Sequence, residues 1–252
     1  MKIRSLFKKY AHLLLRFLGY KIFKVGPYSV FDFESFLYRH LVVHKTLVFL
    51  QIGANDGVMN DPIYRFNMDN KCAVSGYVME PLPDIFQQLV NNYKNCPKIK
   101  PINMAIHATE SEMMLHRLNP EYESDAPDFA KGIASFNESH WEKTKLVHNA
   151  DLMQMIKVKC ISFNKFIESN SINKLDLLLL DTEGYDYEIL MSIDFYLVKP
   201  KMIRFEHGVR NNLMSPQKFL EVCTYLNAKG YQIIAESYDA TAYLLDPQDL
   251  DF

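Results

Sequence analysis

The hydrophobic pattern along the chain predicts short strands that alternate with helices. Apolar runs bounded by polar or turn-forming residues predict strands at 47–52, 74–80, 98–106, 112–118, 155–161, 175–181 and 201–207. Apolar residues at helical spacing predict helices at 84–93, 163–170, 184–193 and 217–230. The last two predicted strands, 231–237 and 241–246, form a hairpin around residues 238–240. This alternation indicates an α/β fold in which helices cover both faces of a mostly parallel sheet.

The first 30 residues carry a different charge pattern. Lysine and arginine recur through this segment, whereas the first acidic residue is Asp32. Apolar residues at helical spacing predict a basic amphipathic helical segment over residues 1–30, followed by one domain over 31–252. Residues 1–25 can lie on an anionic membrane surface, or they can pack against the domain or a partner, and the sequence leaves both open. Arg16 interrupts the apolar stretch, so we do not expect a signal peptide.

Composition and charge narrow the class of protein. With 252 residues, 48% of them hydrophobic, the chain can bury the core of one α/β domain. The net charge of −2 gives no reason to expect a nucleic-acid partner. The four cysteines form no Cys-x-x-Cys pair, which argues against a zinc site and favours a reducing compartment. We therefore expect a cytoplasmic protein, associated with a membrane if residues 1–25 lie on one.

Polar residues and glycines follow the predicted strands where each strand ends. In doubly wound sheets the ligand binds at the carboxyl ends of the strands. This rule collects five groups of residues, which are 53–57, Glu80, 103–107, 181–184 and 206–207.

The first of these turns, in "VFLQIGANDGVMNDP" at 48–62, does not have the pattern of a phosphate-binding loop. Gly53 and Gly57 are separated by Ala-Asn-Asp, with no third glycine and no following Lys-Ser/Thr. Asp56 would repel a pyrophosphate, whereas a ligand with an ammonium, a sulfonium and ribose hydroxyls suits an acidic turn. S-adenosylmethionine is such a ligand, and Glu80 lies where an acid accepts ribose hydroxyls.

Several longer segments resemble one known family. "FLQIGANDG", "YVMEPLPDIFQQL", "NMAIHATESEMMLHRL", "KGIASFNESHW", "VKCISFNKFIE" and "LDLLLLDTEGYDYEIL" occur in the order seen in FkbM-type S-adenosylmethionine-dependent methyltransferases. The resemblance implies a class I methyltransferase, Rossmann-like fold: a doubly wound, mostly parallel seven-stranded sheet with a C-terminal antiparallel hairpin. It also implies O-methylation of a hydroxyl, often on a sugar or a polyketide-type natural product.

The residues expected to bind the cofactor come from the strand ends. They are Gln51, Gly53, Asn55, Asp56, Gly57, Glu80, Asn103, Ala105 and Asp181. Related methyltransferases often have an acid at the position of Gln51. An amide there can still accept a hydrogen bond from the cofactor's ammonium but without a charge, and Asp56 is the alternative partner.

Methyl transfer to a hydroxyl also requires removal of a proton, by a general base or with the help of a metal ion. The candidate catalytic residues are Asp181, Glu183, His207 and His140. Asp181, Glu206 and His207 match by position the ligands of metal-dependent O-methyltransferases, and oxygen ligands would suit Mg²⁺. A third interpretation is that Asp181 and Glu183 only cap the next helix, because acids are favoured near its positive N-terminal end.

A long insertion at 119–150 holds the only tryptophan, Trp141, together with several other aromatic residues. It predicts either an acceptor lid or a small satellite core. The leading hypothesis is an S-adenosylmethionine-dependent O-methyltransferase whose partner is a small-molecule or glycan acceptor. The alternatives are a Rossmann-type nucleotide-dependent oxidoreductase and a catalytically degenerate methyltransferase fold that serves as a binding subunit.

Overall fold

The computed structural model describes residues 31–122, 134–137 and 153–246. They belong to one compact unit, and residues 1–30 lie outside the described residues. The helices are α2 (Phe33–His44), α3 (Tyr64–Asp69), α4 (Pro83–Tyr93), α6 (Phe163–Ser169), α7 (Asp186–Ser192) and α8 (Pro216–Ala228), with 3-10 turns at η1 (Pro120–Tyr122) and η4 (Val209–Asn211). The strands are β1 (Leu47–Ile52), β2 (Val74–Met79), β3 (Ile99–Ile102), β4 (Ala105–Ile106), β5 (Glu112–Leu118), β6 (Ala134–Ser135), β7 (Met153–Ile161), β8 (Leu177–Leu180), β9 (Met202–Glu206), β10 (Gln232–Ala235) and β11 (Asp239–Tyr243).

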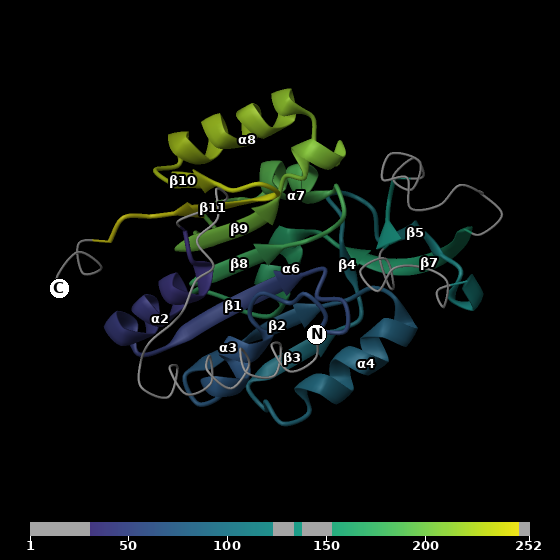
Figure 1. Cartoon of the computed structure of the whole chain (residues 1–252), viewed down its shortest axis with the longest axis horizontal. Coiled ribbons are helices and arrows are strands. Elements are labelled where there is room, and N and C mark those ends of the chain that lie inside the picture. Colours follow the sequence, from purple (N-terminus) through teal and green to yellow (C-terminus); the bar gives the residue numbers. More distant parts are fainter. Residues whose placement is uncertain (1–30, 123–133, 138–152, 247–252) are drawn as a thin grey trace, which may run out of the picture. The chain divides into compact units, whose positions relative to one another are not determined.

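The main sheet has seven strands in the order β10-β11-β9-β8-β1-β2-β3 (Figure 1). The pairs β3–β2, β2–β1, β1–β8 and β8–β9 are parallel, and β11 is antiparallel to both of its neighbours. The predicted α/β fold, with a doubly wound, mostly parallel sheet and a terminal antiparallel hairpin, is confirmed. The turn of the hairpin spans residues 236–238 rather than 238–240, because β11 already begins at Asp239.

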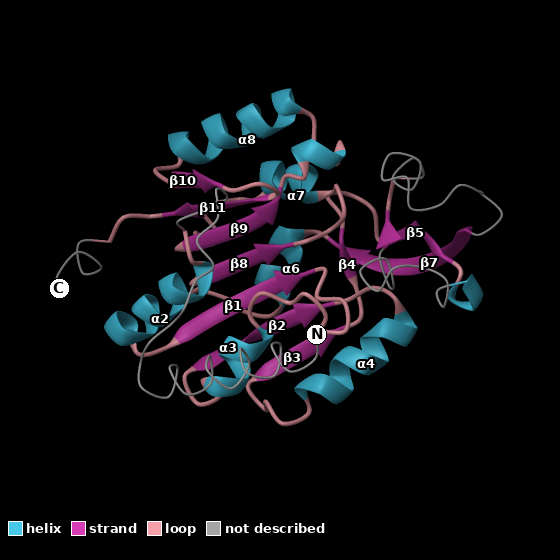
Figure 2. Ribbon diagram, viewed as in Figure 1, coloured by secondary structure: helices cyan, strands magenta, loops and turns pink. Residues whose placement is uncertain are grey.

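Helices cover both faces of this sheet (Figure 2). Side chains of α6, α7 and α8 pack on one face around Leu178, Leu180 and Ile203. Side chains of α2, α3 and α4 pack on the other face around Phe49 and Val78. A strand that is buried on both faces is apolar at nearly every position. This explains why the apolar run at 175–181 predicted the strand β8.

The chain leaves the main sheet after β3 and forms a second sheet in the order β4-β7-β5-β6. The prediction of a single strand at 98–106 is thus wrong, because Ile99–Ile102 and Ala105–Ile106 belong to different sheets. The Asn103 side chain donates hydrogen bonds to the carbonyl oxygens of Glu80 (2.9 Å) and Pro81 (3.0 Å) and fixes the chain at the point of departure. The second sheet has its own small core, which includes Leu115 and Val158.

Two helices were not predicted. Helix α2 buries Phe33, Leu37 and His40, and the histidine hides the apolar stripe in the sequence. Helix α3 is only six residues long, and the carboxylate of Asp61 accepts from the first backbone amides at its start. In α8 the predicted start is confirmed, because Ser215 Oγ accepts from Lys218 N at 3.2 Å.

Two further features bear on the expectations from composition. Among the described helices, none has the length and apolar character of a membrane span. The four cysteines are free thiols, of which Cys96 and Cys160 are buried and Cys72 is exposed.

Candidate active site

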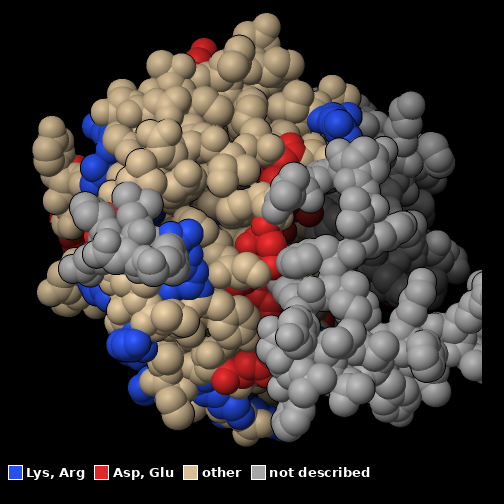
Figure 3. Space-filling model, turned by 60° about the vertical axis from the view of Figure 1, so that its left-hand side comes forward, with Lys and Arg blue, Asp and Glu red and all other residues tan. Residues whose placement is uncertain are grey.

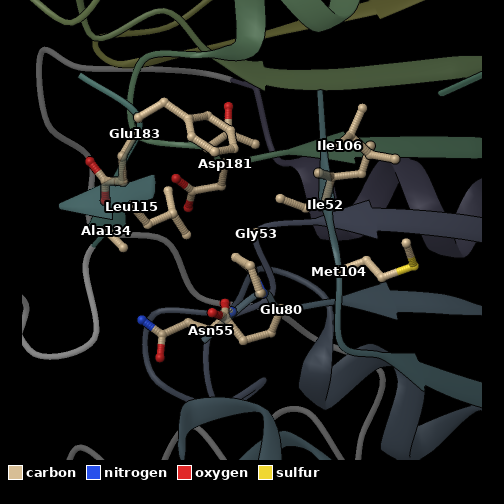
Figure 4. Close-up of a pocket in the computed structure, with 14 residues that line it drawn as sticks. Ile52, Gly53, Asn55, Glu80, Met104, Ile106, Leu115, Ala134, Asp181 and Glu183 are labelled. Carbon is tan, nitrogen blue, oxygen red and sulfur yellow. Dashed lines mark hydrogen bonds between the residues drawn. The ribbon is translucent and has the colours of Figure 1, made fainter. Parts of the chain in front are cut away.

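A cavity opens where β1, β2 and β8 end, and it brings together residues that are far apart in the sequence (Figure 4). Its polar lining includes Asn55, Glu80, Asp181 and Glu183, with Gly53 between the two acidic sides. Its apolar lining is formed by Ile52, Met104, Ala105, Ile106, Leu115, Ala134 and Phe136. The ends of the predicted strands 47–52, 74–80 and 175–181 therefore meet at one place, as expected.

The turn after β1 is fitted tightly between its neighbours. The amides of Gly53 and Ala54 both donate to the carbonyl oxygen of Met79, at 3.1 and 2.9 Å. A Cβ on Gly53 would lie 1.8 Å from the carbonyl oxygen of Asp181. Gly57 has a different role, since a Cβ there would meet Leu89 and Tyr93 of α4 rather than the cavity.

Glu80 is held in place by backbone amides. Its Oε2 accepts from Asn55 N at 3.1 Å and its Oε1 from Leu82 N at 2.8 Å. Burial raises the pKa of this carboxyl to about 8, although the two hydrogen bonds act in the opposite direction. In its ionised form each oxygen of Glu80 has a second lone pair and can accept a hydrogen bond from a hydroxyl of a ligand.

Gln51 and Asp56 are engaged in the turn itself. Gln51 is buried, and its amide nitrogen donates to Asp61 Oδ2 at 2.7 Å. One oxygen of Asp56 accepts from the amides of Val58 and Met59, both at 2.8 Å. Neither Gln51 nor Asp56 lines the cavity, and the acids that do are Glu80, Asp181 and Glu183.

Three carboxyl groups form a cluster at the ends of β8 and β9. Asp181, Glu183 and Glu206 each place one oxygen within 4.8 Å of the others, and they form the one such group among the described residues. The Asp181 side chain is accessible to solvent because it lines the cavity, although the surrounding protein desolvates its carboxyl group. Figure 3 shows acidic side chains gathered in the middle of one face of the molecule.

The pKa values of all three carboxyl groups are raised above the usual values for such groups. Burial and, to a smaller extent, the charges of Asp239 and Asp61 raise the pKa of Asp181 to about 6. Burial raises the pKa of Glu183 to about 8, with repulsion from Asp181 and Asp186 adding to it. For Glu206 the same causes, burial first and then Asp181 and Glu183, raise the pKa to about 10.

His207 does not join this cluster. One of its ring nitrogens faces the carbonyl oxygen of Glu236 and the other the amide of Val209, both at 3.3 Å. The ring also packs on Phe219, with the two centroids 4.5 Å apart. The acids that come together are therefore Asp181, Glu183 and Glu206, in place of the expected set of Asp181, Glu206 and His207.

The other predicted residues are placed as follows. Ala105 lines the cavity, whereas Asn103 supports the backbone behind Glu80. His140 and Trp141 lie outside the described residues, so the lid predicted at 119–150 stays a prediction. Of that insertion, the two-residue strand β6 reaches the site, where Ser135 Oγ donates to the carbonyl oxygen of Glu183 at 2.9 Å.

Two supporting acids were not among the predicted site residues. Asp186 is fully buried and accepts hydrogen bonds from the amide (3.2 Å) and hydroxyl (2.8 Å) of Thr182. The carboxylate of Asp186 thus binds the loop that precedes α7, and the N-cap residue Tyr185 makes no side-chain capping hydrogen bond. Asp61 supports Gln51, and burial raises its pKa to about 6. Asp186 is the last residue of the segment Asp-Thr-Glu-Gly-Tyr-Asp, and it gave no separate signal in the sequence.

The cavity is narrow, with a volume of about 80 Å³. Sites for drug-sized ligands usually enclose roughly 300–1,000 Å³. Binding of an adenosyl ligand therefore requires lining side chains to move apart.

The sheet has one antiparallel strand inserted at its end, and acidic residues meet beyond Gly53. These two features define the class: a doubly wound protein with the architecture of class I methyltransferases. Residues 51–233 match the family model described as "Methyltransferase FkbM domain". The chain therefore belongs to the FkbM methyltransferase family, and the oxidoreductase alternative is set aside.

Solved structures with a similar fold share little sequence with the chain. A putative caffeoyl-CoA O-methyltransferase from Staphylococcus aureus is 10% identical, with 96% of this chain and 98% of that chain covered and a TM-score of 0.49. An O-methyltransferase from Bacillus cereus in complex with SAH is 10% identical, with 87% and 84% covered and a TM-score of 0.44. The Methanococcus jannaschii fibrillarin pre-rRNA processing protein is 14% identical, with 89% and 86% covered and a TM-score of 0.41. No curated protein matches the chain. Similarity at this level carries no conclusion about activity.

Proposed function

We propose that the protein transfers the methyl group of S-adenosylmethionine to a hydroxyl oxygen of a sugar, a glycan or a small hydroxylated metabolite. The observation that carries this proposal is the chemistry of the cavity beyond Gly53. It combines Glu80 and Asp181 with an apolar wall, and its described lining contains no lysine, arginine or histidine to pair with a phosphate. Such a lining suits an adenosyl ligand that has positive charge and no phosphate.

The cofactor groups can be matched to the lining. The two oxygens of Glu80 suit the vicinal hydroxyls of a ribose. Ile52, Met104 and Ile106 offer apolar surface for an adenine ring. The carboxylate of Asp181 suits the positively charged methionine end of the cofactor.

Asp181 is the residue best suited to take the proton of the acceptor hydroxyl. A general base is most effective when its pKa lies near the working pH, and the pKa of Asp181 is raised to about 6. His207 is less suited, because both ring nitrogens face backbone groups. Burial and mutual repulsion raise the pKa of Glu183 and Glu206 as well, so the three acids titrate as one coupled cluster.

A second role for the cluster is to hold Mg²⁺. The oxygens of Asp181, Glu183 and Glu206 are the ligand type that Mg²⁺ prefers, and their spacing allows all three to contact one ion. A bound ion would lower the pKa of the acceptor hydroxyl. Methyl transfer that is unchanged by excess EDTA refutes this role, and loss that Mg²⁺ restores supports it.

Isothermal titration of the full-length protein with S-adenosylhomocysteine, S-adenosylmethionine and NAD tests cofactor binding. We expect both adenosyl ligands to bind and NAD not to bind. Failure of both adenosyl ligands refutes the proposal. Binding without transfer of a tritiated methyl group to any hydroxylated acceptor supports the degenerate binding subunit instead.

The Asp181→Asn variant tests the general base. Loss of a general base typically lowers the rate about 10²- to 10⁴-fold, so we expect at least a hundredfold lower turnover. The matched control is Asp194→Asn, an exposed acid in the segment after α7. Equal turnover of the two variants contradicts the role given to Asp181.

A further inference from the structure

Arg117 is the largest of the fully buried side chains among the described residues, and it is only 1% exposed. It lies on β5, the strand of the second sheet that pairs with β7 on one side and with β6 on the other. Its Nη1 donates to both carboxylate oxygens of Asp84, each at 2.8 Å. A guanidinium at this depth would be costly without a partner, so Asp84 is what allows an arginine here.

The stability of the second sheet gives no reason for this arginine. Apolar side chains of similar size can replace a buried ion pair at little or no cost in stability. The neighbouring core, which includes Leu82, Ile85 and Leu115, is already apolar. A charge at this position therefore calls for a role other than packing.

Asp84 joins Arg117 to the wall of the cofactor cavity. It lies in the first turn of α4, just after the loop that follows β2. In that loop Glu80 Oε1 accepts from Leu82 N at 2.8 Å, and Glu80 Oε2 accepts from Asn55 N at 3.1 Å. The Leu82 side chain also packs in the core of the second sheet. The position of Glu80 thus depends on the start of α4, which the second sheet holds through Arg117 and this core.

The charges of the ion pair also act on Glu80. Burial is the largest cause of its raised pKa of about 8, and the hydrogen bonds from Leu82 and Asn55 oppose the rise. Of the two members of the ion pair, Arg117 lowers this pKa and Asp84 raises it. The described lining of the cavity has no lysine, arginine or histidine. A positive charge that favours the ionised form of Glu80 therefore comes from behind the cavity wall.

We propose that Arg117 is a positioning residue for cofactor binding. Through Asp84 and the start of α4 it holds the carboxyl group of Glu80 at the cavity, and its charge favours the carboxylate form, which can accept from both ribose hydroxyls. This inference rests on the proposed function, because it takes Glu80 to bind the ribose of S-adenosylmethionine. It gives the second sheet a role in cofactor binding, since this sheet supplies the charge that the cavity lining lacks.

Isothermal titration of the full-length protein with S-adenosylhomocysteine, from about pH 6 to about pH 9, tests this role. The ionised form of Glu80 accepts from both hydroxyls, so the affinity should rise as the pH increases through the pKa of Glu80. Arg117→Met should move the midpoint of this rise upward by about one pH unit, and Asp84→Asn should move it downward. An upward shift of about one unit makes binding about tenfold weaker at neutral pH.

The opposite directions separate this role from a purely structural one. Both variants break the same ion pair, so a loss of packing alone would weaken binding in both and leave the midpoint unchanged. Asp181 and Glu183 also line the cavity, but they titrate in every form of the protein, so the difference between the variants reports Glu80. In a Glu80→Gln background, Arg117→Met should shift no midpoint.

Two further variants serve as controls. Arg117→Lys keeps the charge but not the planar guanidinium, and its midpoint should stay near that of the unmodified protein. Lys157→Met removes an exposed charge of β7 that is paired with Glu112 at 2.5 Å, and it should bind as the unmodified protein does. Near-UV circular dichroism shows which variants are folded. If Arg117→Met does not fold, the downward shift in Asp84→Asn decides, because the Asp84 side chain is 50% exposed.

The other outcomes are equally decisive. If S-adenosylhomocysteine does not bind to the unmodified protein, the proposed function fails and this role fails with it. If it binds and the midpoints of Arg117→Met and Asp84→Asn equal that of the unmodified protein, the proposed function stands and the role of Arg117 is refuted. A shift of the same size in Lys157→Met also refutes it, because the effect is then not specific to Arg117.

Discussion

Replacement of Gly53 by alanine is a sharp test of how the centre of the site is packed. Gly53 has a φ of 81°, in the left-handed region, and an added Cβ would lie 1.8 Å from the carbonyl oxygen and 2.7 Å from the carbonyl carbon of Asp181. Both are backbone atoms, so neither can rotate away. The left-handed conformation costs an alanine about 1–2 kcal/mol, and overpacking adds about 1–3 kcal/mol. We expect Gly53→Ala to lower the free energy of unfolding by about 2–5 kcal/mol.

Gly230→Ala is the matched control. Gly230 has a φ of 93°, but the atoms nearest to an added Cβ are 3.9 Å away. Only the conformational cost of about 1–2 kcal/mol applies there. Urea denaturation of both variants, followed by circular dichroism, measures the difference. Titration with S-adenosylhomocysteine should show lost binding for Gly53→Ala and normal binding for Gly230→Ala. Equal denaturation midpoints would refute the argument from the close approach of the two turns.

Three further predictions concern the cofactor, the buried acids and the N-terminal segment. Glu80→Gln should weaken S-adenosylhomocysteine binding about tenfold in calorimetry, and an unchanged affinity would remove Glu80 from the ribose site. The pKa of Glu183 is raised to about 8, so in this pH range the folded state keeps a proton that the unfolded state has lost. The free energy of unfolding should therefore fall as the pH rises from 6.5 to 8. Thermal unfolding should show this fall and a flatter profile for Glu183→Gln; a melting temperature that rises over the same range would contradict it. If residues 1–25 bind membranes, full-length protein should pellet with anionic liposomes and a form that begins at Phe31 should not, whereas equal pelleting rules out that role.

The parts of the fold that could be predicted are those in which local sequence and tertiary environment agree. The run Leu177–Leu180 is buried on both sides and therefore apolar throughout, and the acids that follow such strands meet because parallel strands end at one edge of the sheet. Gly53, Glu80 and Asp181 were found in this way.

The rest depended on partners that a linear pattern does not contain. The role of Gln51 is set by Asp61, which reaches it only through the fold of the following turn. The orientation of His207 is set by the carbonyl of Glu236, 29 residues away in the terminal hairpin. The break between β3 and β4 depends on the side chain of Asn103, whose bonds to Glu80 and Pro81 cross 23 and 22 residues. Each of these is a polar contact between residues at least ten positions apart, and hydrophobic periodicity carries no information about such contacts.

The strand order also has a consequence for synthesis of the chain. Strand β1 lies between β2 and β8. Next to the β1–β8 pairing, Val48 N donates a hydrogen bond to the Asp176 side chain, 128 positions later in the chain. At roughly 5–20 residues per second on the ribosome, β8 emerges roughly 6–26 seconds after β1. Until then β1, β2 and β3 present an unpaired apolar edge, which is a template for pairing with other chains. The nascent chain is thus exposed to aggregation and open to chaperone capture for much of its synthesis.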